Sequence, residues 1–271
     1  MSETRMVQHP GPTEAARVSA LPCRATRRRV TLSAGATLFE AMTEAADGAG
    51  AWFDLTDLPV EKLTFVRPAP SPDDRHVAWY SAERELRDAV IERAGAHLGR
   101  RDGAAFAHIH GMWRAEDGTC HAGHLLAEKT VLSADYTVDV WLLEGAMLET
   151  VPDAETEFTL FRPVATGPVH NPNAVLGAIR PNEVIEDGLE KCAAVSGLFV
   201  SAVKGLGSFV GTQLQGQPAL MDIATEVLLF GENGRCAISV GLEGPPVRGE
   251  LAARANRVCV TFEVLLLSQV K

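Results

Sequence analysis

The chain contains an internal repeat, which restricts it to folds that two similar units can build. The segment 30–55, VTLSAGATLFEAMTEAADGAGAWFDL, aligns without a gap with 177–202, GAIRPNEVIEDGLEKCAAVSGLFVSA. In both segments, an extended stretch leads into apolar positions spaced three and four residues apart, which predicts an amphipathic helix. Gly50 and Gly197 are predicted to end these helices, and an apolar strand follows each of them.

The ends of the two halves also match. YTVDVWLLEG (136–145) resembles VCVTFEVLLLS (258–268), with Asp139 opposite Glu263, and both segments are typical of strands. Between the halves, FRPVATGPVHNPNAV has the proline content of a linker. We therefore predict an α+β fold of two tandem domains, residues 28–163 and 173–271, joined by a linker at 164–172. Each domain is expected to be a mostly antiparallel sheet with one flanking helix.

The composition favours a globular protein. The chain has 271 residues, of which 46% are hydrophobic and 22% are charged, and no apolar run approaches the length of a membrane span. Its five cysteines are scattered and form no Cys-x-x-Cys pair, so we expect reduced thiols and a cytoplasmic location. The net charge of -10 does not favour direct binding to nucleic acid. Arg24 and Arg27–Arg29 form the one basic cluster, which we interpret as a solvated edge preceding the first strand.

Four of the eight histidines lie between residues 108 and 124. The alternation in AFAHIHGMW predicts a strand on which His108 and His110 face the same side. AEDG (115–118) predicts a turn, and TCHAGHLL predicts the returning strand of a hairpin. This hairpin brings His124 across from the first pair, with His121 as the less favoured candidate because it faces the other way.

Three converging imidazoles with a fourth position open are typical of catalytic zinc. The alternative is a set of packed or surface histidines, because His-x-His alone is a weak signal. The second half offers a control, since Ala237 and Ser239 stand where we place His108 and His110, and Glu250 replaces His124. Joint loss of all three favours a metal site in the first half alone. His9, His76, His97 and His170 are assigned to loops or termini, without a function.

At these residues the sequence resembles the PCC (also PPC) domain family. HIHG, EDG and AGHL match its His-x-His strand, its turn and its Gly-Gly-His-Leu segment. In the second half, RPNEVIEDGLEKCAAVSGLFVSAVKGLGSFVG resembles the family's first strand, helix and Gly-x-Gly-Ser-Phe loop, and TEVLLFGENG its central strand. The resemblance covers residues 28–163 and 173–271. The sequence departs from the family's pattern in two places. The first half has TDLPVEKLTF in place of the Gly-x-Gly-Ser-Phe loop, and the second half lacks the histidines.

The resemblance implies a trimer with metal at His108, His110 and His124, and a fold similar to that of acetolactate decarboxylase, a zinc enzyme. We expect the first half to supply the metal ligands and the second half to supply neighbouring walls in a trimer-like assembly. The family's other description, DNA-binding or regulatory protein, is an alternative function. No AT-hook is present, and the net charge of -10 is unfavourable to it. A structural metal that pins a trimeric assembly is a further alternative.

The preferred hypothesis is a protein that binds Zn²⁺, or another divalent transition metal, and acts on or senses a small carboxylate or carbonyl compound. A metal-dependent lyase or hydrolase fits this hypothesis. Glu128 is the candidate acid or base, and Arg114 is the candidate partner of a substrate carboxylate. Backbone amides of Gly205, Gly207 and Ser208 are candidate anion contacts. The expected partners are an anionic small molecule and further copies of the chain, in a trimer.

Overall fold

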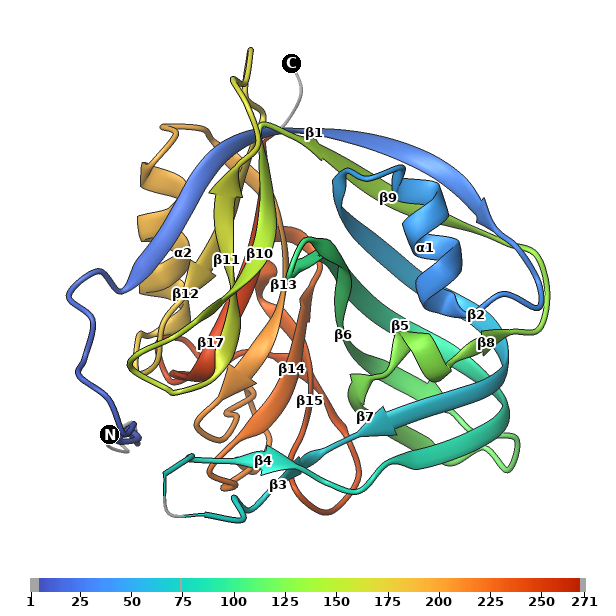
Figure 1. Ribbon diagram of the computed structural model, residues 1–271. Coiled ribbons are helices and arrows are strands. Elements are labelled where there is room, and N and C mark those ends of the chain that lie inside the picture. The colour runs from blue at the N-terminus through green and yellow to red at the C-terminus, as the bar shows by residue number, and fades with distance from the viewer. Residues whose placement is uncertain (1–4, 74, 269–271) are drawn as a thin grey trace.

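The computed structural model describes residues 5–73 and 75–268. The fold is α+β, as predicted, and in the described chain two α-helices lie against a 15-stranded, mostly antiparallel sheet (Figure 1). Of the strand pairs in this part of the chain, one is parallel, that of β5 (Arg84–Arg101) with β10 (Ala146–Pro152). Neither helix has the length and apolar character that crossing a membrane would require.

The first half of the chain forms one run of neighbouring strands. Its order in the sheet is β1-β9-β2-β5-β6-β7. These strands are β1 (Val18–Leu32), β2 (Gly50–Val66), β5, β6 (Ala104–Arg114), β7 (Cys120–Leu125) and β9 (Tyr136–Glu144). Shorter elements are β3 (Pro68–Ala69), β4 (Trp79–Tyr80), the 3-10 helix η1 (Ala127–Lys129) and β8 (Val131–Leu132). After β9 the chain forms a hairpin of β10 and β11 (Thr159–Ala165).

The second half repeats this pattern of pairing. Its order is β12-β17-β13-β14-β15-β16, in which each strand has the same place as its counterpart in the first half. The strands are β12 (Ala174–Ile179), β13 (Val200–Phe209), β14 (Thr225–Phe230), β15 (Cys236–Val240), β16 (Val247–Glu250) and β17 (Val258–Ser268), with a 3-10 helix η2 (Glu232–Gly234) after β14.

The long strand β1 joins the two runs into one sheet. Its residues 18–23 pair with β12, and its residues 24–32 pair with β9. A buried cluster also spans the halves, because Trp52 and Trp141 of the first half pack in the same core as Leu206 and Leu228 of the second. The two halves therefore share both backbone hydrogen bonds and apolar packing.

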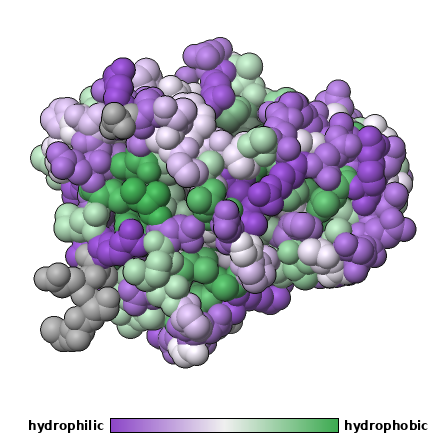
Figure 2. Space-filling model, turned by 90° about the horizontal axis from the view of Figure 1, so that it is seen from below, coloured by the Kyte–Doolittle hydropathy of each residue, from purple (hydrophilic) through white to green (hydrophobic). Residues whose placement is uncertain are grey.

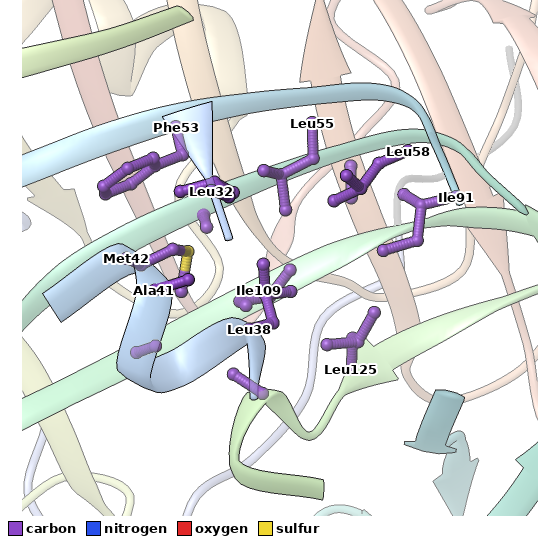
Figure 3. Close-up of a cluster of buried hydrophobic side chains, with 14 of the residues drawn as sticks. Leu32, Leu38, Ala41, Met42, Phe53, Leu55, Leu58, Ile91, Ile109 and Leu125 are labelled. Carbon is purple, nitrogen blue, oxygen red and sulfur yellow. The ribbon is translucent and has the colours of Figure 1, made fainter. Parts of the chain in front are cut away.

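The helices occur where the periodicity predicts them. α1 (Leu38–Ala46) begins at Thr37, whose hydroxyl accepts a hydrogen bond from the Glu40 amide, while the Glu40 side chain accepts one from the Thr37 amide. Its apolar face, including Met42, packs on the sheet of the first half (Figure 3). α2 (Ile185–Ala194) is its counterpart in the second half.

The predicted glycine caps are wrong. α1 ends at Asp47, which is left-handed with φ 46°, and α2 ends at Val195 in right-handed helical geometry. Aspartate tolerates the left-handed region better than most residues do, so it takes the place expected for glycine. Gly50 is instead the first residue of β2.

Three other segments also differ from the prediction. The exposed basic cluster lies inside β1 rather than before the first strand, and Arg27 pairs with Asp139 at 2.7 Å. His97 lies in β5, 1% exposed, and not in a loop. Residues 164–165 of the predicted linker belong to β11. Cross-strand pairing overrides local composition at each of these places.

Seen from below, the surface is largely hydrophilic and carries several separate hydrophobic areas (Figure 2). The small hairpin of β3 and β4 lies at the bottom of Figure 1, beneath the second-half strands. Its residues Trp79 and Tyr80 are 43% and 47% exposed. This hairpin therefore presents two aromatic side chains at the surface.

Candidate metal centre

The predicted histidine hairpin is confirmed. β6 and β7 pair antiparallel, with His110 directly opposite His124, and a tight turn joins them. One ligand nitrogen from each of His108, His110 and His124 lies within 4.8 Å of the others. In the described part of the chain, this is the one group of three such side chains that could hold a metal ion. His121 faces the other side of the hairpin, where it lies against Phe65.

The outer nitrogen of each imidazole has a neighbour in the protein. Nδ1 of His110 lies 3.0 Å from the carbonyl oxygen of Val227, and Nδ1 of His108 lies 3.0 Å from a carboxylate oxygen of Glu263. The phenol oxygen of Tyr80 lies 3.3 Å from Nδ1 of His124. When Nδ1–H donates to such a partner, Nε2 keeps the lone pair that binds a metal.

The inner nitrogens face one another. Nε2 of His108 lies 3.0 Å from Nε2 of His110. Oε2 of Glu226, on β14, lies 2.6 Å from the same nitrogen of His110. The ligand nitrogens thus converge beside a carboxylate from the second half.

Burial sets the charge state of the cluster. It lowers the pKa of His108 to about 3, and the neighbouring charge of His110 acts in the same direction. Burial likewise lowers the pKa of His124 well below its ordinary value. For His110, burial is outweighed by the Glu226 carboxylate and the Val227 carbonyl, so its pKa is raised. His108 and His124 are therefore neutral near pH 7, which is the form that binds metal.

The carboxylates provide a test of whether a cation fits. Glu226 and Glu263 are 9% and 1% exposed, and in each the Oε2 atom lies within 3.0 Å of an imidazole nitrogen of the triad. Burial raises the pKa of Glu263, whereas the imidazoles, chiefly His110, lower that of Glu226 against the effect of burial. Buried carboxylates need compensating positive charge. Three imidazoles beside two such carboxylates fit a divalent cation.

A cavity of about 610 Å³ opens in front of the triad. Residues of both halves form its wall, as we expected for the second half. Of the predicted substrate and catalytic residues, Gly207, Ser208 and Glu128 line this cavity. Glu128 is an exposed residue of η1.

Two predicted residues lie outside the cavity lining. Arg114 is exposed at the end of β6, and its Nε donates to Glu92 at 2.9 Å. Gly205 faces the second-half core, where an added Cβ would lie 3.0 Å from Phe262. The GLGSF segment is part of strand β13 rather than a loop. Its glycines permit close packing against β17, since an added Cβ on Gly207 would lie 2.3 Å from the Thr261 carbonyl oxygen.

The counterpart hairpin of β15 and β16 contributes to no group of metal-ligating side chains in the part of the second half that the structure describes. There Ser239 pairs with Val247 and Glu250 pairs with Cys236, so the sequence equivalence of Glu250 with His124 is wrong in register. The hydroxyl of Ser239 lies 2.8 Å from that of Thr212 in a buried position. This hairpin therefore buries hydroxyl groups where its counterpart presents imidazoles.

Sequence reasoning missed four residues of the site: Tyr80, Arg101, Glu226 and Glu263. A signal existed for the two glutamates, because each is a lone acid in an otherwise apolar strand, TEVLLF or VCVTFEVLLLS. Arg101 and Tyr80 gave no such signal. Their place at the site depends on how β4 and β5 end, which the sequence pattern does not show.

No family model and no curated protein matches this chain. Solved structures resemble about half of it. A metal-containing protein from Archaeoglobus fulgidus has 21% identity and a TM-score of 0.41, over 50% of this chain and 92% of that one. A plant- and prokaryote-conserved (PPC) protein from Pyrococcus horikoshii has 14% identity and a TM-score of 0.39, over 52% and 95%. A candidate DNA-binding protein from Ralstonia eutropha JMP134 has 12% identity and a TM-score of 0.39, over 51% and 94%.

Proposed function

We propose that this protein binds zinc at His108, His110 and His124 and acts on a small carboxylate or carbonyl compound, as a lyase or hydrolase. The observation that carries the proposal is the convergence of three ligand nitrogens beside a buried carboxylate in a cavity. Imidazole ligands suit zinc among the common divalent ions, although other transition metals bind the same donors.

Some residues of this site would bind the metal ion, and others position the residues that bind it. A bound zinc ion would supply Lewis acidity and lower the pKa of a coordinated water. His108, His110 and His124 would hold the ion, while Glu263, the Val227 carbonyl and Tyr80 would keep the three imidazoles in position.

Proton transfer belongs to a carboxylate of the second half. Glu226 lines the cavity beside the triad, and its Oε2 is the atom that takes or gives a proton. Glu128, our candidate from the sequence, lies in the same lining but is exposed. We therefore prefer Glu226 for this role and keep Glu128 as a second candidate.

Measurement of metal content tests the proposal. The purified protein is expected to contain one zinc ion per chain by mass spectrometry of the metal, and His108→Ala is expected to lose it. His121→Ala is the matched control, because His121 lies on the same hairpin but outside the triad. Full zinc content in His108→Ala, with circular dichroism like that of the wild type, would contradict the metal site.

The wider setting is also part of the proposal. We propose two tandem PCC-like domains, 28–163 and 173–271, in a cytoplasmic protein that forms a homotrimer. The net charge of -10 disfavours binding of nucleic acid. A small anionic ligand would bind despite this charge because the metal supplies local positive charge. Light scattering after gel filtration measures the oligomer. Tight binding of duplex DNA at 150 mM salt would favour the regulatory alternative.

A further inference from the structure

The cavity carries a cation that has no acidic partner among residues 5–73 and 75–268. Arg101 lines the cavity at the end of β5, and the ion pairs among the described residues do not include it. Its guanidinium carbon lies 3.7 Å from the centre of the Phe106 ring. Stacking of this kind fixes the plane of the guanidinium and leaves its edge able to bind a carboxylate with two parallel hydrogen bonds.

Two phenyl rings connect Arg101 with the histidines. The centre of the Phe106 ring lies 5.5 Å from that of Phe161, and the Phe161 ring lies 6.4 Å from the imidazole of His108. Both phenylalanines line the cavity. The wall between the cation and the candidate metal centre is therefore apolar and aromatic.

A second aromatic pair adds to this wall. Trp79 and Phe158 also line the cavity, with ring centres 5.7 Å apart. Aromatic residues make up 6% of the whole chain, so their concentration in this lining favours a ligand with an apolar body. A short acid such as pyruvate would leave these rings without contact.

We infer that the cavity binds an elongated organic acid. Its carboxylate is bound by Arg101, its apolar or aromatic body lies on Phe106 and Phe161, and a carbonyl or hydroxyl oxygen at its other end faces the histidine triad. This inference rests on the proposed function and names its substrate class. It also replaces Arg114 by Arg101 as the carboxylate-binding residue.

Calorimetric titration of the zinc-loaded protein tests the inference with three probes. 4-Acetylbenzoate carries a carboxylate, an aryl body and a ketone, whereas acetophenone lacks the carboxylate and pyruvate lacks the body. We expect 4-acetylbenzoate to bind more tightly than either of the other probes. Arg101→Gln should weaken its binding by roughly 10- to 100-fold, because a charged hydrogen bond is lost, and should leave acetophenone unaffected.

Arg100→Gln is the matched control, because Arg100 is the exposed neighbour of Arg101 in β5 and does not line the cavity. Equal affinity of Arg101→Gln and wild type for 4-acetylbenzoate would overturn the inference, as would pyruvate binding equally well. The zinc content of the same samples separates the two proposals. Zinc-loaded protein that does not bind the acid refutes only the inference. Zinc-free protein that binds it through Arg101 supports the inference and refutes the metal site.

Discussion

Glu263 contacts the candidate metal centre at the outer nitrogen of one imidazole. Its Oε2 lies 3.0 Å from Nδ1 of His108, and Oε1 accepts a hydrogen bond from the Thr261 hydroxyl at 3.1 Å. A carboxylate in this position orients the ring and raises the basicity of the ligand nitrogen. We expect Glu263→Gln to weaken zinc binding by roughly 10- to 100-fold, measured by competition with a chromophoric chelator.

The control for this change is Glu250→Gln, an exposed acid at the end of β16. It should leave zinc affinity as in the wild type. If Glu263→Gln binds zinc as tightly as the wild type while His108→Ala binds none in the same assay, the Glu263 carboxylate does not strengthen zinc binding through His108.

At the scale of single residues, the sequence predicted the convergence of the three histidines better than their surroundings. Alternation along one strand was enough to place His108 and His110 together, because their spacing is local. Glu226 and Glu263 reach the same point from strands more than a hundred residues further along. Arg114, the candidate partner of a substrate carboxylate, lies instead at the exposed end of β6 beside Glu92.

Strand β13 illustrates how one element depends on its neighbour. Gly207 lies against β17, the strand that carries Glu263, and an added Cβ would lie 2.3 Å from the Thr261 carbonyl oxygen and 2.6 Å from Cα of Phe262. Backbone atoms cannot move aside as a flexible side chain can. We expect Gly207→Ala to lower the free energy of unfolding by roughly 1–3 kcal/mol or more, measured by urea denaturation.

Gly205→Ala is the comparison within the same strand. Its added Cβ would meet Phe262 at 3.0 Å, a contact that a small shift relieves, so the loss should be smaller. The reverse order of the two losses would contradict a role of Gly207 in the approach of the two strands.

Elements were predictable where periodicity is strong. Both helices and the histidine hairpin follow from it, whereas the loop expected at GLGSF follows from the family resemblance alone. Here glycine serves the packing of strands instead. The second hairpin was misaligned because apolar alternation fixes which face a residue occupies but does not fix which residue it pairs with.

At the scale of the whole molecule, a buried ion network ties three parts of the chain together. Oδ2 of Asp153, in the β10–β11 connection, lies 2.7 Å from both Arg162 of β11 and Arg180 after β12. Arg17 of the N-terminal segment pairs with the nearby Glu155 at 2.8 Å. These ion pairs connect the segment before β1, the hairpin of β10 and β11, and the second half of the chain.

Asp153 gives the fold a pH dependence. Burial raises its pKa, but hydrogen bonds from Thr156 and the charges of Arg162 and Arg180 outweigh burial and hold the pKa below its ordinary value. Such a carboxylate stabilises the fold at every pH above its unfolded pKa of about 3.9, and the contribution is lost as the pH falls through the lower, folded value. Asp153→Asn should cost on the order of 3 kcal/mol at pH 7, because Arg162 loses its ion-pair partner and Arg180 keeps only the more distant Glu155.

Unfolding free energies measured from pH 7 to pH 2 check this expectation. The difference between wild type and Asp153→Asn should stay constant down to about pH 5 and shrink below about pH 4. Glu144→Gln, an exposed change at the end of β9, should show no such difference. A gap between wild type and Asp153→Asn that widens on acidification would contradict the sign of this linkage.

The joining of the halves could not be predicted from the repeat. Similar segments show that two units resemble each other but do not show where one unit touches the other. Residues 18–23 precede the predicted first domain, yet they extend β1 across to β12. The packing of Trp52 and Trp141 against Leu206 and Leu228 appears only in the assembled fold.

Because the two halves both contribute residues to the site, the site is completed in two stages during synthesis. The ribosome adds His108, His110 and His124 well before Glu226 and Glu263. At typical translation rates of about 5–20 residues per second, the completed hairpin waits several seconds or longer for its carboxylates. During that interval His108 and His110 lack the second-half partners, Glu263 and the Val227 carbonyl, that select their tautomers. A metal captured by the nascent chain would be held by the hairpin alone, so we expect the cell's free metal pool to influence which ion is enclosed.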